Sequence, residues 1–209
     1  MLKTKKWLAL LEVGFFTFFL LFFIWWLIPH GYKHWSIPSS MLLLIISSHF
    51  WHGENLYQIG LDYRNFLSSF GVASLIIFFI IVGCTCIIIL SGKYILFGGQ
   101  STGVWLKYFA GYILWASFQQ YLLFYIVNRL AIFLGRESRW VTIVSAAIFS
   151  VVHYPNMILM YACLLGGLVI VELFLKYRSL YFLAVGQALI GGTIHILGYS
   201  MKVGPGYWK

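Results

Sequence analysis

The sequence predicts an all-α membrane protein, a polytopic helix bundle of about seven transmembrane segments. Hydrophobic residues make up 62% of its 209 residues, and only 9% are charged, whereas a soluble domain carries roughly 25% charged residues. So few charges are not enough to cover a water-facing surface. The apolar residues also form long uninterrupted blocks, which indicates that the surrounding solvent is lipid.

Seven apolar segments account for most of the chain. Five of them approach or exceed the roughly 20 residues that a helix needs to cross the hydrocarbon core. The second and fifth are shorter, so we expect them to tilt, to thin the bilayer locally or to be partly buried. In chain order the segments are 7–28, 35–50, 66–90, 104–127, 140–153, 157–175 and 180–199. The first is not expected to be a signal peptide, because its apolar run exceeds the roughly 7–15 residues of a signal core.

The distribution of basic residues supports seven crossings. The chain has 14 Lys and Arg against 5 Asp and Glu, and in a membrane protein this excess is typical of cytoplasmic loops rather than of nucleic-acid binding. With Lys3, Lys5 and Lys6 in the cytoplasm, seven spans place most of the other basic residues there as well and leave the C-terminus outside. The residues placed inside in this way are Arg64, Arg129, Arg136, Arg139, Lys176 and Arg178.

Polar residues at membrane depth are costly and usually mark a pathway or a site. Four stand out: Gln119 and Gln120 in the fourth segment, His153 at the end of the fifth and His195 late in the seventh. At 1.5 Å per residue, the glutamines lie about 15 Å, His153 about 18 Å and His195 about 24 Å from their cytoplasmic ends. All three segments can therefore contribute polar groups to one layer of the bundle.

Small residues lie on the same helix faces as these polar groups. In the seventh segment Ala184, Ala188 and Gly191 share a face with His195, and Tyr199 is one turn further on. Such a stripe permits close helix contact and directs the histidine to the interior. Similar stripes are Thr142, Ser145, Phe149 and His153 in the fifth segment, and Ala116 and Gln120 in the fourth. The alternative is that these groups are interhelical hydrogen bonds alone, each contributing about 1 kcal/mol.

Three short motifs resemble those of the CPBP intramembrane proteases (CAAX proteases and bacteriocin-processing enzymes). Phe149-Ser-Val-Val-His153 followed by Tyr-Pro-Asn matches the FxxxH motif of that family, and the stretch from Arg178 to His195 resembles its last motif helix. The stretch from Ile59 to Asn65 resembles the segment that precedes its core. The resemblance implies N-terminal transmembrane segments over 1–55 and a protease core over 56–200, in a single membrane domain.

Two positions depart from the family pattern. Where the family has the motif EExxxR, this chain has Gln119, Gln120 and Phe124, and where the last motif has Asn, Asp or His, it has Tyr199. In the family a glutamate of the first motif is thought to activate water, while the histidines and the last residue position water and stabilise the oxyanion. A glutamine cannot accept that proton. A neutral histidine can act as the base instead, with the glutamine amides and the Tyr199 hydroxyl as oxyanion donors.

No other acid is expected in this layer. Glu12 and Glu172 are interpreted as anchors at the membrane interface, and the remaining acids, Glu54 among them, fall in loops. Two histidines without a carboxylate provide fewer ligands than zinc usually has, since most zinc sites have three or four protein ligands. The involvement of a metal therefore stays open, and no cofactor is predicted.

The residues and the resemblance together predict an intramembrane endopeptidase of the cell membrane. Its expected partners are the lipid bilayer and a membrane-embedded protein or peptide substrate, with no nucleic acid. The site residues would be Gln119, Gln120, His153, His195 and Tyr199. One alternative is a non-catalytic pseudoprotease that binds a membrane peptide or partner in immunity or regulation. A small transporter is a further alternative, but the two halves show no obvious inverted repeat.

Overall fold

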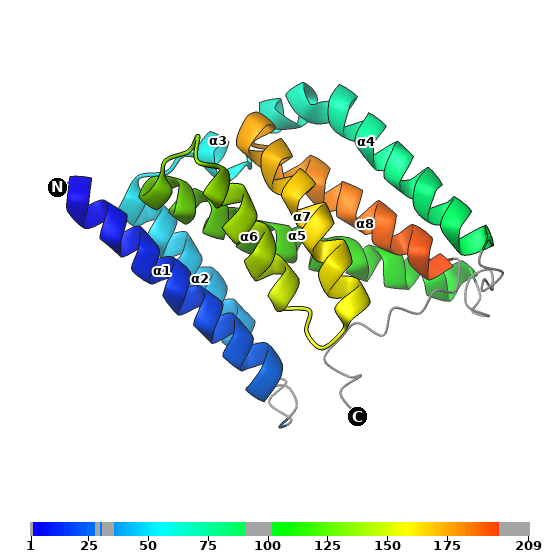
Figure 1. The fold of residues 1–209 in the computed structure, drawn as a ribbon, viewed down its shortest axis with the longest axis horizontal. Helices are drawn as coiled ribbons and strands as arrows, with labels where there is room; N and C mark the ends of the chain where they lie inside the picture. Colours follow the sequence, from blue (N-terminus) through cyan, green and yellow to red (C-terminus); the bar gives the residue numbers. More distant parts are fainter. Residues whose placement is uncertain (1, 28–29, 31–35, 91–101, 197–209) are drawn as a thin grey trace.

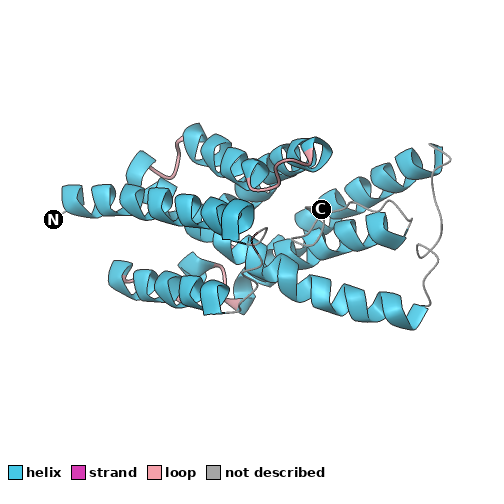
Figure 2. Cartoon of the chain, turned by 90° about the horizontal axis from the view of Figure 1, so that it is seen from below, coloured by secondary structure: helices cyan, strands magenta, loops and turns pink. Residues whose placement is uncertain are grey.

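The computed structural model describes residues 2–27, 30, 36–90 and 102–196, and their regular structure is entirely helical. The predicted all-α class is confirmed for this part of the chain. Figure 1 shows helices that run back and forth past one another, joined by short loops that are also visible from below in Figure 2. In chain order they are α1 (Leu2–Phe22), the π-helical turn η1 (Phe23–Leu27), α2 (Ser36–His52), α3 (Leu56–Ile59), α4 (Tyr63–Leu90), α5 (Thr102–Leu134), α6 (Arg139–Val151), α7 (Met157–Tyr177) and α8 (Leu180–Ile196).

Each predicted apolar segment coincides with one of the longer helices. The largest difference is at the end of α5, which continues to Leu134 instead of ending near Val127. The additional turns contain Asn128 and Arg129, whose side chains are buried. They remain in the helix because they find hydrogen-bonding partners inside the protein rather than in water. The domain boundary expected at residue 55 falls between α2 and α3, and the division of the chain into two parts stays a prediction.

Helix α5 is the longest described helix, and most of the others are arranged around it. It packs against α1, α6 and α8, while α4 lies along α8 and α6 lies along α7. The rings of Phe124 on α5 and Phe174 on α7 stack face to face with centroids 3.8 Å apart. Phe16 on α1 meets Tyr125 on α5 edge to face at 4.9 Å. These aromatic contacts lie in one continuous core cluster that includes residues from α1, α2, α5, α6, α7 and α8.

The loops at one end of the bundle are joined by hydrogen bonds. Asn65 at the start of α4 donates to the carbonyl oxygen of Arg178 at 2.5 Å, and the amide of Leu180 donates to the carbonyl of Gly60 at 2.9 Å. From α5, Asn128 donates to the carbonyl of Gln58 at 3.1 Å. The α2–α4 connection, the last turns of α5 and the α7–α8 turn therefore meet at the same end. That end carries the arginines that the sequence predicted to be cytoplasmic.

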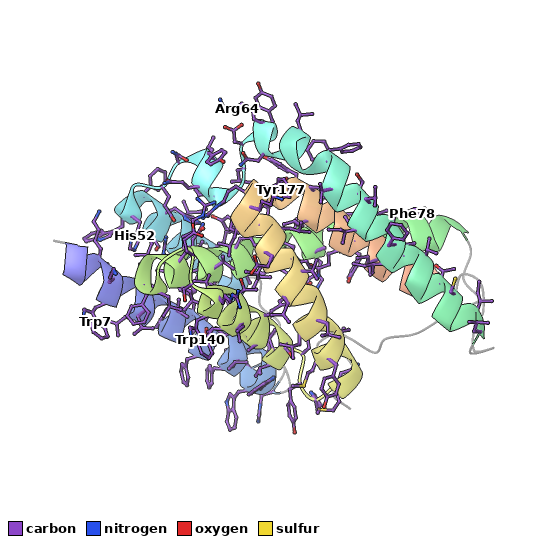
Figure 3. All side chains as sticks on the ribbon, turned by 45° about the horizontal axis from the view of Figure 1, so that its top comes forward. Trp7, His52, Arg64, Phe78, Trp140 and Tyr177 are labelled. Carbon is purple, nitrogen blue, oxygen red and sulfur yellow. The ribbon has the colours of Figure 1, made fainter. Side chains whose placement is uncertain are left out.

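The described part of the chain buries several polar side chains in its apolar core and exposes many large apolar ones. Arg129 and Gln120 are fully buried, with no exposed surface. Large apolar side chains instead project from the outer surface (Figure 3): Trp7 is 61% exposed, Phe78 60% and Trp140 63%. Water does not favour such a surface, whereas lipid does, and polar side chains in a lipid environment turn towards the protein interior.

Within the residues that the structure describes, two helical stretches are long and apolar enough to cross a membrane, Lys5–Leu27 and Leu159–Tyr177. The predicted seven spans are therefore not confirmed and stay a prediction. Helix α6 is too short for a straight crossing, because its 13 residues extend only about 20 Å at 1.5 Å per residue. The hydrocarbon core is about 30 Å thick.

We expect Gly60→Ala to destabilise the protein more than Gly135→Ala. Both glycines have φ near +90° (90° and 93°), where a side chain costs about 1–2 kcal/mol. A Cβ at position 60 would also lie 2.9 Å from the Phe174 ring and 3.2 Å from the Arg178 carbonyl oxygen, whereas position 135 is open. Thermal unfolding of the purified protein in detergent measures the difference. Equal losses for the two variants would contradict the close approach of the α2–α4 connection to the α7–α8 turn.

Candidate functional site

Three glutamines connect α5 to α8 in the middle of the bundle. Gln187 on α8 donates from its amide nitrogen to the Gln119 side-chain oxygen at 2.7 Å. Gln120 in turn donates to the side-chain oxygen of Gln187. The result is a chain of amide hydrogen bonds, which we call the glutamine relay, running from Gln120 through Gln187 to Gln119. It leaves the Gln120 oxygen without a partner among the described residues and the Gln119 amide nitrogen as a donor for a further acceptor.

Small residues let the two helices approach closely enough for this relay. Ala116 on α5 and Ala184 and Ala188 on α8 are buried, as the small-residue stripes predicted. One turn beyond, a Cβ added to Gly191 would lie 2.5 Å from the Tyr112 hydroxyl oxygen. The Tyr112 hydroxyl is also hydrogen-bonded to Gln187. Tyr112 therefore extends the polar contact between α5 and α8 beyond the relay.

His153 follows the end of α6, in the turn that leads to α7. Its Nδ1 lies 2.7 Å from the carbonyl oxygen of Phe149, and its ring meets the Phe149 ring edge to face at 5.1 Å. A carbonyl oxygen can only accept, so Nδ1 carries the proton, and in the neutral ring Nε2 is a base. Ser150 donates to the carbonyl of Met160 at 2.7 Å, and Asn156 caps the start of α7. These bonds fix the turn that positions the histidine.

The structure describes the side chains of some predicted site residues and not of others. Gln119 and Gln120 are brought together through Gln187, and the polar contact that His153 makes is with its own helix. His195 lies in the backbone of α8, two turns beyond Gln187, but the side chains described along this helix end at Gly191. Tyr199 lies outside the described residues. A common cavity for the two histidines and the glutamines stays a prediction.

A second polar cluster lies at the end of the bundle where the loops meet, and we call it the Arg129 cluster. The Arg129 guanidinium makes ion pairs with Glu12 of α1 at 2.7 Å and with Glu54 of the α2–α3 connection at 2.8 Å. It also donates to Ser48 of α2 at 3.0 Å and lies over the Tyr125 ring at 4.8 Å. One buried arginine of α5 therefore contacts α1, α2 and the α2–α3 connection, besides a ring of its own helix.

Two histidines complete the Arg129 cluster. Nδ1 of His49 lies 2.5 Å from a carboxylate oxygen of Glu54, and Nε2 of His52 lies 3.1 Å from a carboxylate oxygen of Glu12. Burial alone would raise the pKa of Glu54, but hydrogen bonds from His49 and Arg129 and the charge of Arg129 outweigh it and hold this pKa at about 2. Burial and the charge of Arg129 lower the pKa of His52. Glu54 is therefore ionised at neutral pH, and His52 is neutral.

The sequence analysis did not predict this cluster. Glu12 was interpreted as an anchor at the membrane interface and Arg129 was placed on the cytoplasmic side, and the structure adds that the two side chains pair and that Arg129 is buried. Glu54 does lie in a connection, as predicted, but its carboxylate turns inward. A helical signal was present in α5, where Tyr121, Tyr125 and Arg129 are spaced i, i+4, i+8 and therefore share one face.

Gln187 was also missed, although a glutamine within an apolar segment is the same kind of signal that identified Gln119 and Gln120. No group of three or more His, Cys, Asp or Glu side chains among the described residues is arranged to hold a metal ion.

No protein-family model, no curated protein and no solved structure matches the chain. The resemblance to the CPBP proteases thus stays a prediction that depends on the motif residues.

We expect Gln187→Leu to destabilise the protein by about 1 kcal/mol or more, because it leaves two amides without their partner in apolar surroundings. Replacing Gln119, Gln120 and Gln187 together by leucine should cost less than the sum of the three single changes, since no orphaned amide remains. Thermal unfolding in detergent of the four variants measures this. Strict additivity would mean that the three amides do not interact.

Proposed function

We propose that this chain is a multi-pass membrane protein that acts as an intramembrane endopeptidase of the CPBP type. The observation that carries the proposal is the contact between α5 and α8 through the glutamine relay. It joins the two helices that carry the first and last motif positions of the family, Gln119 and Gln120 on α5 and His195 on α8. Helix α6, which carries the FxxxH motif, packs against α5 and ends just before His153.

The chemistry follows from the protonation of these groups. His153 Nε2 accepts a proton from water, and the resulting hydroxide adds to the carbonyl carbon of the substrate peptide bond. Amide N–H groups, that of Gln119 first, donate to the oxyanion that forms. The tetrahedral intermediate then collapses as its C–N bond breaks, and the histidine returns its proton to the leaving amine nitrogen. In this scheme His195 and Tyr199 position the water and the substrate.

The second candidate is a non-catalytic protein that binds a membrane peptide. The observation that favours it is the composition of the glutamine relay. Its three members are all amides, which neither accept nor release a proton in the working pH range; they bond to one another, and the Gln120 oxygen has no partner among the described residues. Such a relay is suited to the recognition of a peptide backbone. The two candidates share one fold and one site and differ in whether a bond is cut.

The multi-pass arrangement predicts the sides on which reporters are active. Hydrogen bonds place the α2–α4 connection and the α7–α8 turn at one end, and the contact between Trp7 and Phe133 at 5.6 Å brings the start of α1 to the end of α5. By the positive-inside rule this basic end is cytoplasmic. A reporter inserted after Gly135 should be active in the cytoplasm, and one at the C-terminus on the outer side. Activity of both reporters on one side would rule out seven crossings.

The proposed protease activity predicts that both histidines are required. His153→Ala and His195→Ala should each reduce peptide cleavage by about 10²-fold or more, the contribution of a general base or of its positioning. The assay uses purified protein in liposomes and a broad set of transmembrane peptides. His30→Ala is the matched control, because His30 is exposed and bonds to the Trp26 carbonyl, and it should cleave as the wild type does. Unchanged cleavage by the His153 variant would refute its assignment as the base.

Substitution of Gln119 or Gln120 by glutamate distinguishes the proposed endopeptidase from the proposed non-catalytic binding protein. If the wild type is an enzyme that works with amides, Gln120→Glu should lower its activity, because a buried carboxylate resists ionisation and disturbs the relay. If the wild type only binds, it should cut none of the peptides, and Gln119→Glu or Gln120→Glu is the change that can create cleavage. Partner identification by crosslinking should precede the assay, so that the peptide set includes the bound segment.

A further inference from the structure

Arg178, in the turn between α7 and α8, is a buried cation that no carboxylate contacts among the described residues. It is 7% exposed. Its Nη1 donates to the carbonyl oxygen of Gln58 at 3.2 Å and to the side-chain oxygen of Asn128, and both acceptors are neutral. The negative charge of Glu54 reaches it from a distance, but that carboxylate is already paired with Arg129. A buried charge without a bonded counter-charge is unfavourable.

The rest of the Arg178 guanidinium reaches the surface. Nε and Nη2 make no hydrogen bond with a described residue, and neither is among the fully buried atoms that lack a partner. Both nitrogens therefore keep some exposed surface, although the side chain as a whole is enclosed. The guanidinium carbon lies 5.0 Å from the centroid of the Phe174 ring. Two neighbouring N–H groups of a guanidinium match two oxygens of a phosphate or a carboxylate.

A second arginine lies at the same turn. Arg136, in the α5–α6 connection, is exposed and donates from Nη2 to the carbonyl oxygen of Leu175 at 2.5 Å, three residues before Arg178. Burial and the charge of Arg136 lower the pKa of Arg178 to about 10, so Arg178 stays protonated at neutral pH. A carbonyl at a helix C-terminus attracts a cation but carries only a partial charge. The two guanidiniums therefore form a site of net positive charge.

The backbone of Arg178 is unusual for a residue with a long side chain. It has φ 54° and ψ 41° at the end of α7, a left-handed conformation in which glycine is the usual residue and a side chain is strained. Within the described part of the chain, it is the one residue other than glycine with positive φ. Such strain persists where surrounding contacts fix the residue. The contacts of Arg178 thus hold its guanidinium at this turn.

Exposed aromatic side chains lie at the same end of the bundle. They are Trp140 at the start of α6, Tyr57 on α3 and Tyr181 at the start of α8, and Trp140 projects outward in Figure 3. Tyr181 donates to the carbonyl oxygen of Leu61 at 3.0 Å. Tryptophan and tyrosine are enriched at the level of the lipid headgroups. In the proposed multi-pass arrangement, the two arginines therefore lie at the headgroups of the cytoplasmic leaflet, which contains anionic lipids.

We propose that Arg136 and Arg178 form a binding site for a phosphate group, and that an anionic phospholipid of the cytoplasmic leaflet supplies it. Arg178 donates to the phosphate from Nε and Nη2, and Arg136 donates from the N–H groups that Leu175 does not use. The phosphate provides the counter-charge and links the α5–α6 connection to the α7–α8 turn. Basic pockets between helices on the cytoplasmic side bind lipid headgroups in this way. This inference uses the proposed membrane location but not the protease activity, so a protein that cleaves nothing should still bind the lipid.

Native mass spectrometry of the full-length protein in detergent tests the site. Phosphatidylglycerol is compared with phosphatidylcholine of the same acyl chains, whose choline cation offsets the phosphate charge. The wild type should bind phosphatidylglycerol more tightly. Arg178→Gln and Arg136→Gln should each weaken binding of the first phosphatidylglycerol by about tenfold or more, the effect of losing hydrogen bonds to a charged group. The double variant should bind little more weakly than either single one, because both residues serve one site.

Lys6→Gln is the matched control. It removes one exposed positive charge from the same end of the bundle, where Trp7 contacts Phe133 of α5, and it should weaken binding far less than either arginine variant. Because Arg136 is exposed, its variant decides the test if Arg178→Gln does not fold. Equal binding of the two lipids by the wild type would overturn the proposal. So would an equal effect of Lys6→Gln, which would mean a diffuse attraction to the basic end.

Inorganic phosphate tests the other source of the same chemical group. Thermal unfolding of the wild type in detergent should show stabilisation by phosphatidylglycerol, and this stabilisation should be lost in Arg136→Gln and kept in Lys6→Gln. Stabilisation by inorganic phosphate but not by phosphatidylglycerol would overturn the assignment to a lipid.

Discussion

The ion pairs of Arg129 are the interaction on which the arrangement of the N-terminal half depends. A guanidinium without exposed surface cannot remain unpaired in an apolar bundle, since removing one partner of a buried pair costs about 3–5 kcal/mol. Its two carboxylates come from α1 and from the connection after α2. Satisfying one side chain of α5 therefore fixes where α1 and α2 lie.

The same helix carries the candidate site on another face. Gln119 and Gln120 bond to α8 through Gln187, about two to three turns from Arg129 along α5. Asn128, next to the arginine, bonds to the α2–α4 connection. Each polar face of α5 thus meets a different part of the chain. Because a buried polar group needs a hydrogen-bonding partner inside the protein, these side chains organise the packing more specifically than the apolar contacts between the helices do.

Much of the fold could be predicted from the sequence. Apolar segments and small-residue stripes report burial and helix length directly, so the long helices and the inward faces of Ala184 and Ala188 were predicted correctly. The partners of individual polar residues could not be predicted, because a residue's hydrogen bonds depend on which helix faces it. Arg129 obeys the positive-inside rule and was assigned to a loop, although it is the most buried of the charged side chains described. Gln187 was passed over because no motif includes it.

The central claim is that Arg129 binds the N-terminal helices to the core through its carboxylate partners. A double-mutant cycle of Glu12→Gln and Arg129→Gln, measured by unfolding in detergent with Glu137→Gln in place of Glu12→Gln as the control cycle, tests it most directly. We expect a coupling energy of about 1–3 kcal/mol for the Glu12 cycle and additivity within about 0.5 kcal/mol for the control. Additivity of Glu12 and Arg129 would contradict the claim.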